Sequence, residues 1–305
     1  MEAAQLNVVT GAFSYTGKYI TRRLLSTGKR VRTLTGRPNH ENPFGNRVSA
    51  FPFTFDNPSQ LRKTLEGATT LYNTYWVRFP HGGVTFDKAI ENTKTLIKAA
   101  EAAGIRRIVH ISITNPSEES PFPYFRGKAL VEKAIMDSKL SYAIVRPTVI
   151  FGLGSILINN IAWLLRKFPI FAVFGSGDYR IQPVFVEDVA EIAVSAGHKD
   201  ENIVIDAVGP EIYTFDEFTR LIAEKVRSRA KIVHVGPGLV LWIGRLIGYA
   251  VKDVVMTKDE IEGLMSNLLV SKGHPTAPTR FSEWLTQNAN NVGTKYISEL
   301  RRHYR

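Results

Sequence analysis

The sequence predicts an α/β fold in which a doubly wound, parallel sheet fills the first half of the chain. Short apolar runs alternate with segments of helical spacing over the first 150 residues, and turn-forming residues separate them. A glycine-containing loop joins the first apolar run to the first helix. Strands that alternate with helices are typical of a parallel sheet covered on both faces, and right-handed crossovers make it doubly wound.

The first strand is expected over residues 5–10, because this apolar run ends at Gly11. A helix follows over residues 15–26, where apolar side chains recur three and four residues apart, and Gly28 stands where a C-terminal cap belongs. The other strands of this half are expected at residues 30–35, 50–55, 69–75, 107–112 and 141–145. The other helices are expected at residues 59–65, 85–103 and 124–138.

Turn-forming residues place the ends of these elements. Gly36-Arg37-Pro38 ends the second strand and Asp56-Asn57-Pro58 ends the third. Gly104 stops the long helix, and Arg146-Pro147 ends the sixth strand. Glycine, proline and asparagine favour turns for known steric reasons, so these boundaries follow from chemistry as well as from pattern.

The pattern changes after residue 150. An apolar helix is expected over residues 155–167, a strand-to-helix step over 184–194 and a strand over 202–207, and the remainder reads as mainly helical and irregular. Residues 1–150 are therefore predicted to form a dinucleotide-binding domain. Residues 180–207 are expected to return to this domain, and residues 151–179 and 208–305 to form a smaller, mainly helical substrate-binding lobe.

Composition excludes several classes of protein. The 305 residues are 44% hydrophobic, which is enough for a sizeable core. The absence of cysteine excludes disulfides, thiolate metal sites and a cysteine nucleophile. No His/Asp/Glu cluster has metal-ligand spacing, and no G-x-S-x-G motif supports a hydrolase. The N-terminus enters a strand without a signal-like segment, so a cytoplasmic location is expected.

The formal net charge of +11 favours anionic ligands such as nucleotides. The basic residues are dispersed, without a long tract or interleaved aromatics, so no specific nucleic-acid binding is expected. No uninterrupted apolar run is long enough to span a membrane. The nearest stretch is Val235–Val255, and within it Gly236–Val255 has Trp242, Leu246 and Ile247 on one helical side. We expect this segment to pack within the lobe, with a substrate channel, a membrane face or a quinone-like ligand as alternatives.

The loop from Thr10 to Gly17 is the predicted phosphate site. A strand enters it and a helix leaves it, with Gly11 and Gly17 at the outer positions of the spacing that lets pyrophosphate approach a helix N-terminus. Ser14 occupies the middle position, where its side chain either crowds the pyrophosphate or bonds to it. The loop and the strand–helix alternation together predict a Rossmann fold.

The residues after the second strand favour NADP(H), with NAD(H) as the alternative. No acidic residue stands there to bind a ribose 2′-hydroxyl; Arg37 does, and a guanidinium pairs well with a 2′-phosphate. A solvated Arg37 is the competing interpretation, and Arg32 and Lys18 add positive charge nearby. Asp56 follows the third strand, where it either bonds to the adenine amino group or caps a turn.

Four motifs of the chain match known patterns. The loop resembles TGxxGxxG with one substitution, and Tyr124-Phe125-Arg126-Gly127-Lys128 resembles YxxxK. Arg146-Pro147-Thr148 with Phe151-Gly152 resembles RPxxxxG, and residues 183–190 resemble a later strand-to-helix signature. Over nearly its whole length the chain therefore resembles the short-chain dehydrogenase/reductase superfamily in its extended and atypical branch, close to the NmrA-like and complex I accessory-subunit-like groups.

The resemblance implies roles for individual residues. Tyr124 is the expected acid/base, Lys128 lowers the pKa of Tyr124 and binds the nicotinamide ribose, and Thr114 positions the substrate. Ser112 is expected to contact the cofactor. The full set of expected cofactor-binding residues is Thr10, Gly11, Phe13, Ser14, Tyr15, Gly17, Arg37, Asp56, Asn73, Thr74, Ser112, Lys128 and Pro147.

The preferred function is an NADP(H)-dependent oxidoreductase that transfers a hydride between nicotinamide and a carbonyl, enone or quinone-like small molecule, with an apolar or aromatic substrate. The alternative is an NAD(P)(H)-binding sensor or assembly factor without turnover. A nucleotide-sugar epimerase or dehydratase needs tightly held NAD, and Gly36-Arg37 argues against it. The sequence leaves the oligomeric state and the substrate open.

Overall fold

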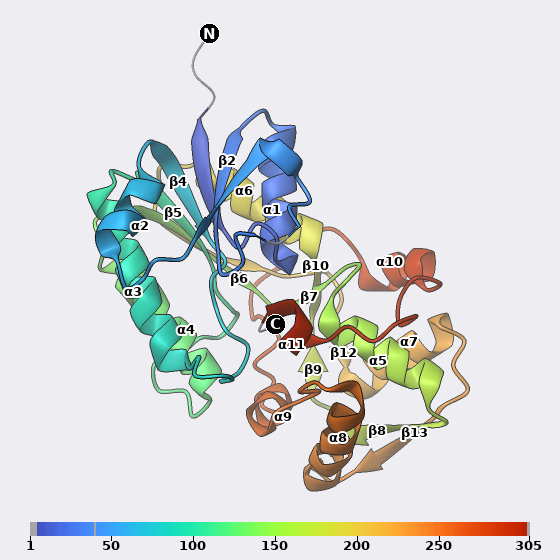
Figure 1. Ribbon diagram of the computed structural model, residues 1–305. Helices are drawn as coiled ribbons and strands as arrows, with labels where there is room; N and C mark the ends of the chain where they lie inside the picture. Colours follow the sequence, from blue (N-terminus) through green and yellow to red (C-terminus); the bar gives the residue numbers. More distant parts are fainter. Residues whose placement is uncertain (1–4, 40, 304–305) are drawn as a thin grey trace. The chain divides into compact units, whose positions relative to one another are not determined.

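The computed structural model describes residues 5–39 and 41–303 of the chain (Figure 1). Within them, seven strands form one sheet in the order β11-β6-β5-β4-β1-β2-β3. The pairs from β3 through β6 are all parallel. The predicted fold class, a Rossmann-like α/β fold, is therefore confirmed. The strand bounds are β1 Leu6–Thr10, β2 Arg30–Thr35, β3 Val48–Pro52, β4 Ala68–Asn73, β5 Arg107–Ile111, β6 Ser141–Pro147 and β11 Ile203–Ala207.

The strand order reverses between β1 and β4. From this point, β1, β2 and β3 follow one another toward one edge of the sheet, and β4, β5 and β6 follow one another toward the other edge. Open α/β sheets bind their ligands in the crevice at the carboxyl ends of the strands where this reversal occurs. The ends of β1 at Thr10 and of β4 at Asn73 therefore mark the expected position of a dinucleotide.

Helices cover both faces of this sheet (Figure 1). Helices α2, α3 and α4 pack over one face, on a core that includes Val8, Leu71, Ile108 and Ile144. Helices α1 and α6 pack against one another on the other face. The helix bounds are α1 Tyr15–Ser26, α2 Pro58–Leu65, α3 Phe86–Ala102, α4 Pro123–Met136 and α6 Val186–Gly197, and a short 3-10 helix, η1, covers Gly45–Arg47.

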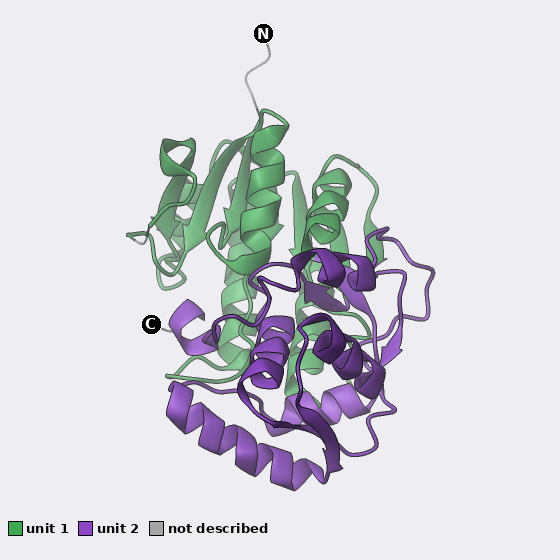
Figure 2. Ribbon diagram, turned by 90° about the vertical axis from the view of Figure 1, so that its right-hand side faces the viewer, with its two compact units in different colours: residues 1–147, 186–206 green, residues 148–185, 207–305 purple. Residues whose placement is uncertain are grey.

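The chain divides into two compact units, shown in different colours in Figure 2. Unit 1 comprises residues 1–147 and 186–206, and unit 2 comprises residues 148–185 and 207–305. The α6 segment thus returns to the sheet of unit 1. That unit 2 binds a substrate remains a proposal.

Unit 2 has its own aromatic-rich core, which includes Phe151, Phe174, Phe218, Phe281 and Trp284. Its helices are α5 Ile156–Lys167, α7 Phe215–Lys225, α8 Pro237–Val251, α9 Lys258–Met265, α10 Phe281–Asn288 and α11 Glu299–His303. Three two-stranded sheets accompany them: β7 Val149–Phe151 with β10 Pro183–Phe185, β8 Ile170–Phe174 with β13 Lys231–Val235, and β9 Arg180–Ile181 with β12 Tyr213–Thr214.

Two predicted strand ends differ from the structure for local reasons. The third strand ends at Pro52 instead of residue 55, because its pairing with β2 stops opposite Thr35. The next aromatic side chains, Phe53 and Phe55, stack on each other with ring centroids 4.9 Å apart. The fourth strand ends at Asn73 instead of residue 75. The N–H of Tyr75 donates to the side-chain Oδ1 of Asn73 at 3.1 Å and not to a neighbouring strand.

Candidate functional site

The phosphate loop is a tight turn that only small residues at its outer positions allow. Gly11 has a φ of +66°, and its N–H donates to the Leu34 carbonyl at 2.7 Å. A Cβ built on Gly17 would lie 2.1 Å from the carbonyl oxygen of Gly11. Helix α1 therefore packs directly onto the loop backbone, which is the close approach that the glycine spacing predicts.

Ser14 fits the middle position of the loop without strain. Its φ of −78° and ψ of 174° are accessible to any L-residue. Its Oγ donates to the Gly11 carbonyl at 2.6 Å, and its N–H donates to the same oxygen at 2.8 Å. The side chain thus points back onto the loop and does not cap α1.

The start of α1 has the features of an anion site. No side chain caps the helix, and no acidic residue lies in its first turn. Uncapped first-turn N–H groups and the positive end of the helix dipole bind phosphates well. Phe13 and Tyr15 flank Ser14 and are half-buried, with the Tyr15 ring 5.7 Å from that of Tyr19. The residues from Gly11 to Gly17 therefore fit a pyrophosphate.

Gly17→Ala should weaken NADPH binding by roughly 10- to 100-fold, since relieving the overlap with Gly11 costs about 1–3 kcal/mol and moves the helix off the loop. Fluorescence titration measures the affinity, and thermal unfolding reports whether the variant folds. Gly244→Ala is the matched control, because a Cβ there meets open space. An affinity for NADPH equal to that of the wild type would contradict this arrangement of the loop.

A buried hydrogen-bond network fixes the strand ends beside the loop. The Thr10 hydroxyl donates to Asn73 Oδ1 at 3.1 Å and accepts the Thr74 N–H at 2.7 Å. Thr74 Oγ1 donates to the Thr10 carbonyl at 2.5 Å. Asn73 is fully buried, and its Nδ2 lies 3.1 Å from Nδ1 of His110. Asn73 thus aligns β1, β4 and β5, whereas half-buried Thr74 lies nearer the surface.

The two residues predicted for the adenosine half occupy separate loops. Arg37 is half-buried after β2, with its N–H donating to Thr35 Oγ1 at 3.2 Å. Asp56 is exposed after β3, and the neighbouring Asn57, not Asp56, caps α2 by accepting the Gln60 N–H at 3.1 Å. The helix cap at this position is therefore Asn57, and both roles predicted for Asp56 stay predictions.

Arg32, which we expected to add charge at the cofactor, is committed elsewhere. Its guanidinium donates to the carbonyls of Thr64 and Glu66 at the end of α2. The same group lies 5.4 Å from the centre of the Phe51 ring. Arg32 thus ties α2 to the sheet edge.

Tyr124 and Lys128 lie one turn apart near the start of α4. Lys128 is 3% exposed, and its Nζ donates to the carbonyl of Ile111 at 2.8 Å. Its Nζ also lies 4.8 Å from the centre of the Trp76 ring. Tyr124 is half-buried, with its ring edge-on to Trp76 at 6.0 Å. The tyrosine and the lysine therefore share one indole neighbour.

Sequence reasoning missed the role of Trp76. Its ring stacks on Phe86 and reaches Gly127, where a Cβ would lie 2.8 Å from the indole. A glycine inside a helix is unfavourable by about 1 kcal/mol, so it usually marks a close contact. Gly127, between Tyr124 and Lys128, indicates a close contact on this side of α4, but the sequence does not identify the neighbour as Trp76. Trp76 covers the lysine that the resemblance assigns to the cofactor.

Burial lowers the pKa of Lys128 to about 7, and the nearby carboxylate of Glu132 counteracts part of this shift. Glu132 is itself buried and paired with Arg146, whose Nε lies 3.0 Å from Oε1. Burial also lowers the pKa of His110, and Lys128 lowers it further. His110 is therefore neutral and accepts a hydrogen bond from Asn73 at Nδ1.

Two more predicted site residues carry buried hydroxyls. Ser112 and Thr114 follow β5, and they are 4% and 0% exposed. Among the described residues, neither hydroxyl oxygen has a hydrogen-bond partner. The backbone N–H of Thr114 donates to the carbonyl of Pro147 at 3.0 Å, which joins the ends of β5 and β6. Unsatisfied buried hydroxyls are costly, and they are common where a ligand supplies the partner.

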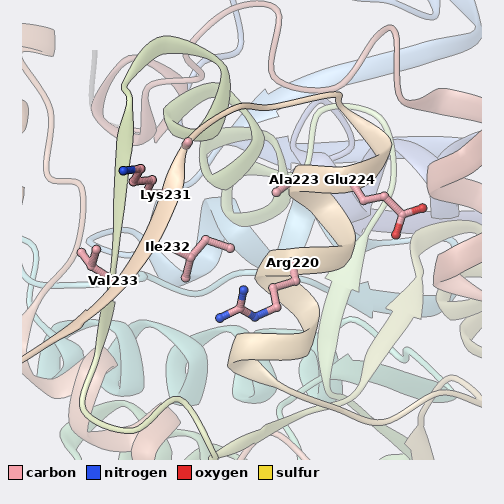
Figure 3. A pocket seen from close by; sticks show the side chains of 7 residues that line it. Arg220, Ala223, Glu224, Lys231, Ile232 and Val233 are labelled. Atoms are coloured by element: carbon pink, nitrogen blue, oxygen red, sulfur yellow. The ribbon is translucent and has the colours of Figure 1, made fainter.

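One surface depression belongs to unit 2 and is lined by other residues than those predicted for the dinucleotide. It has a volume of about 660 Å³ and lies between α7 and β13, lined by Arg220, Glu224, Lys231 and neighbouring apolar side chains (Figure 3). None of the residues predicted for the dinucleotide lines it.

Within residues 5–39 and 41–303, no group of three or more His, Asp or Glu side chains could hold a metal ion. Over the same residues, every helix is too short or too polar to cross a membrane.

Comparisons with known proteins agree with this geometry. Residues 11–151 match a family model described as NAD(P)H-binding. The chain is 23% identical to a mitochondrial NADH dehydrogenase [ubiquinone] 1 alpha subcomplex subunit 9 from Arabidopsis thaliana, over 86% of this chain and 70% of that protein.

Two solved structures share the fold. A UDP-glucose 4-epimerase from Thermotoga maritima has a TM-score of 0.73 at 13% identity, covering 94% of this chain and 98% of its own. A triphenylmethane reductase from Citrobacter sp., complexed with NADP(H), has a TM-score of 0.67 at 18% identity, covering 92% and 99%. The expected NAD(P)-binding domain is confirmed: residues 11–151 match the NAD(P)H-binding model, and the chain shares its fold with these two structures.

Proposed function

We propose that unit 1 binds NADP(H) and that the chain transfers a hydride between its nicotinamide and a carbonyl, enone or quinone-like small molecule. The observation that carries this proposal is the position of Lys128, which lies in α4 one turn from Tyr124, is buried, and donates from its Nζ to the Ile111 carbonyl at 2.8 Å. The uncapped N-terminus of α1 supports the cofactor half of the proposal. Bound NADPH supplies the hydride.

The chain's own residues would bind the cofactor and handle the proton. The N–H groups at the start of α1 hold the pyrophosphate, and Arg37 meets the 2′-phosphate. Lys128 Nζ offers hydrogen bonds to a ribose hydroxyl once the Trp76 indole moves aside. The Tyr124 hydroxyl protonates the developing alkoxide, and a positive Lys128 favours the tyrosinate that remains. Thr114 Oγ1 stabilises the substrate oxygen.

Steady-state oxidation of NADPH against a panel of quinones, enones and aldehydes tests this function. We expect at least one class to support turnover, with an apolar or aromatic substrate preferred. NADPH that binds without turnover on any class would reject the enzyme proposal and leave the binding proposal standing.

A second function, cofactor binding without turnover, is favoured by one specific observation. The Trp76 ring covers the Lys128 Nζ at 4.8 Å and abuts α4 at Gly127, so the lysine is closed off from ligands. The Arabidopsis relative is named as a subunit of NADH dehydrogenase, a name that fits an accessory role. The name of this relative also includes the word mitochondrial, so a mitochondrial location is the alternative to the expected cytoplasmic one. Imaging of this chain fused to a fluorescent protein distinguishes the two locations.

Arg37→Gln should weaken NADPH binding by about 10- to 100-fold and leave NADH binding unchanged, because a charge-assisted bond to the 2′-phosphate contributes about 1.5–3 kcal/mol. Paired fluorescence titrations with the two cofactors measure this. Arg47→Gln changes an exposed arginine of the same unit and serves as the control. Equal loss of affinity for NADPH and NADH would mean that Arg37 supports the structure of the loop after β2 and does not bind the 2′-phosphate.

A further inference from the structure

Helix α8 of unit 2 carries a stripe of large apolar side chains that face solvent. Leu239, Trp242, Leu246 and Tyr249 are 49%, 58%, 53% and 89% exposed. They recur at intervals of three and four residues, so they lie along one side of the helix. We call these four residues the α8 stripe. Isolated exposed apolar residues are ordinary, but an aligned row of four marks an interaction surface.

The opposite side of α8 is already occupied. Val240 and Leu241 pack against the core of unit 2, and Gly248 is the one buried residue of the helix. A Cβ on Gly248 would lie 2.6 Å from the Asp253 carbonyl oxygen, so this turn of α8 lies against the chain that follows it. The α8 stripe therefore points away from the core that holds the helix in place.

The charges beside the α8 stripe are positive. Arg245 is the only charged residue of α8, and Lys252 follows at its C-cap; both are exposed. The nearby Asp253 is buried, and its carboxylate accepts hydrogen bonds from the N–H groups of Glu299 and Leu300 and from the Tyr296 hydroxyl. That carboxylate is therefore turned inward, and α8 itself contributes no acidic group.

We propose that the α8 stripe docks on the surface of an anionic phospholipid bilayer, with α8 lying in the plane of the interface. Tryptophan and tyrosine favour the boundary between headgroups and acyl chains, and leucine inserts below it. Arg245 and Lys252 reach anionic headgroups with their long side chains. The α8 stripe is about 15 Å long, at 1.5 Å per residue, and such helices insert to a depth of about 5–10 Å.

The combination of residues favours a bilayer over a protein groove. Tryptophan and leucine on one side of a helix, with arginine and lysine beside them, are typical of helices that lie in a lipid interface. The formal net charge of +11 adds attraction toward an anionic surface. This proposal rests on unit 2 alone and holds whether or not unit 1 turns over a substrate.

Flotation of the full chain with vesicles tests the proposal. We expect binding to vesicles of phosphatidylcholine mixed with phosphatidylglycerol, weaker binding to phosphatidylcholine alone, and loss of binding at high salt. The double variant Trp242→Ser/Leu246→Ser should lower the vesicle affinity at least about tenfold, because it removes two inserted side chains. Arg245→Glu/Lys252→Glu should abolish the preference for phosphatidylglycerol.

The matched control is Leu153→Ser/Ile212→Ser, which removes two apolar side chains of unit 2 that are 49% and 47% exposed. It should float as the wild type does. Unchanged thermal unfolding confirms that every variant folds. No flotation of the wild type with phosphatidylglycerol vesicles, or equal flotation of the stripe variant, would overturn the proposal. So would a dimer, seen by sedimentation without lipid, that the stripe substitutions dissociate, because a second copy of the chain would then be the occupant.

Discussion

Tyr124→Phe should abolish turnover with every substrate that the wild type reduces, by about 10²- to 10⁴-fold, while NADPH affinity stays close to that of the wild type. The substitution removes the hydroxyl that protonates the alkoxide and keeps the ring. The ring is the part that contacts Trp76, Phe86 and Phe125, so the packing around α4 is unchanged. Initial rates of NADPH oxidation and a parallel titration measure the two quantities separately.

Tyr142→Phe is the control for this prediction, because Tyr142 is a half-buried tyrosine of the same unit that the mechanism does not use. Turnover should be unaffected there. If Tyr124→Phe retains the wild-type rate, then the proton comes from another group, and Tyr124 is not the acid/base that the resemblance to YxxxK implies. If both variants lose activity, the effect belongs to folding and the thermal unfolding curves will record it.

Lys128→Met should make the protein more stable than the wild type at neutral and lower pH, with the advantage shrinking as pH rises. Burial holds the pKa of Lys128 at about 7, against 10.5 for an ordinary lysine. Between these values the unfolded chain binds one proton more than the folded chain, so the stability of the wild type rises with pH. The shift corresponds to about 5 kcal/mol between its two ends.

Urea unfolding from about pH 6 to about pH 9.5 measures this difference, and it should change by roughly 3 kcal/mol over that range. Lys133→Met is the control, because Lys133 is an exposed lysine of the same helix. Three groups face Lys128: the Glu132 carboxylate, the His110 ring and the Trp76 indole. Burial lowers the pKa of His110 well below its ordinary value of 6.5. A difference that does not vary with pH would mean that Lys128 is charged throughout.

The same buried lysine connects stability with cofactor binding. A nearby anion favours the charged form of Lys128, so bound NADPH should raise its pKa and draw in a proton. A lysine that destabilises the fold without ligand is typical of a functional site, where residues are retained for their chemistry. This gives Lys128→Met two expected effects in opposite directions: higher stability and weaker cofactor binding.

The sheet and its helices followed from the sequence because their causes are local. Apolar periodicity set the limits of α1 and β2 to the residue, and turn chemistry set most others within two residues. The loop from Gly11 to Gly17 could also be predicted, because the close packing of α1 on the loop leaves no room for a Cβ at Gly17. The strands β8 and β13 were missed because they form a separate two-stranded sheet, outside the alternation of strands and helices that marks unit 1.

The surroundings of the predicted catalytic pair were not legible, because they depend on contacts between distant segments. No sequence pattern indicates that Trp76 lies over Lys128, or that Asn73 is shared among Thr10, Tyr75 and His110. The direction of the Ser14 side chain was equally open, and the structure shows its Oγ bonded to the Gly11 carbonyl. Side-chain direction is a tertiary property that spacing alone does not define.

A crystal structure of the chain grown with NADPH tests the central claim most directly, namely that unit 1 holds a dinucleotide between the start of α1 and Lys128. We expect the pyrophosphate over the first turn of α1, the 2′-phosphate at Arg37 and a ribose hydroxyl bonded to Lys128 Nζ, with the Trp76 indole displaced. A dinucleotide bound elsewhere would show that this is not the binding site. A nicotinamide ribose that does not contact Lys128, with the Trp76 indole still over the lysine, would show that Lys128 does not bind the cofactor.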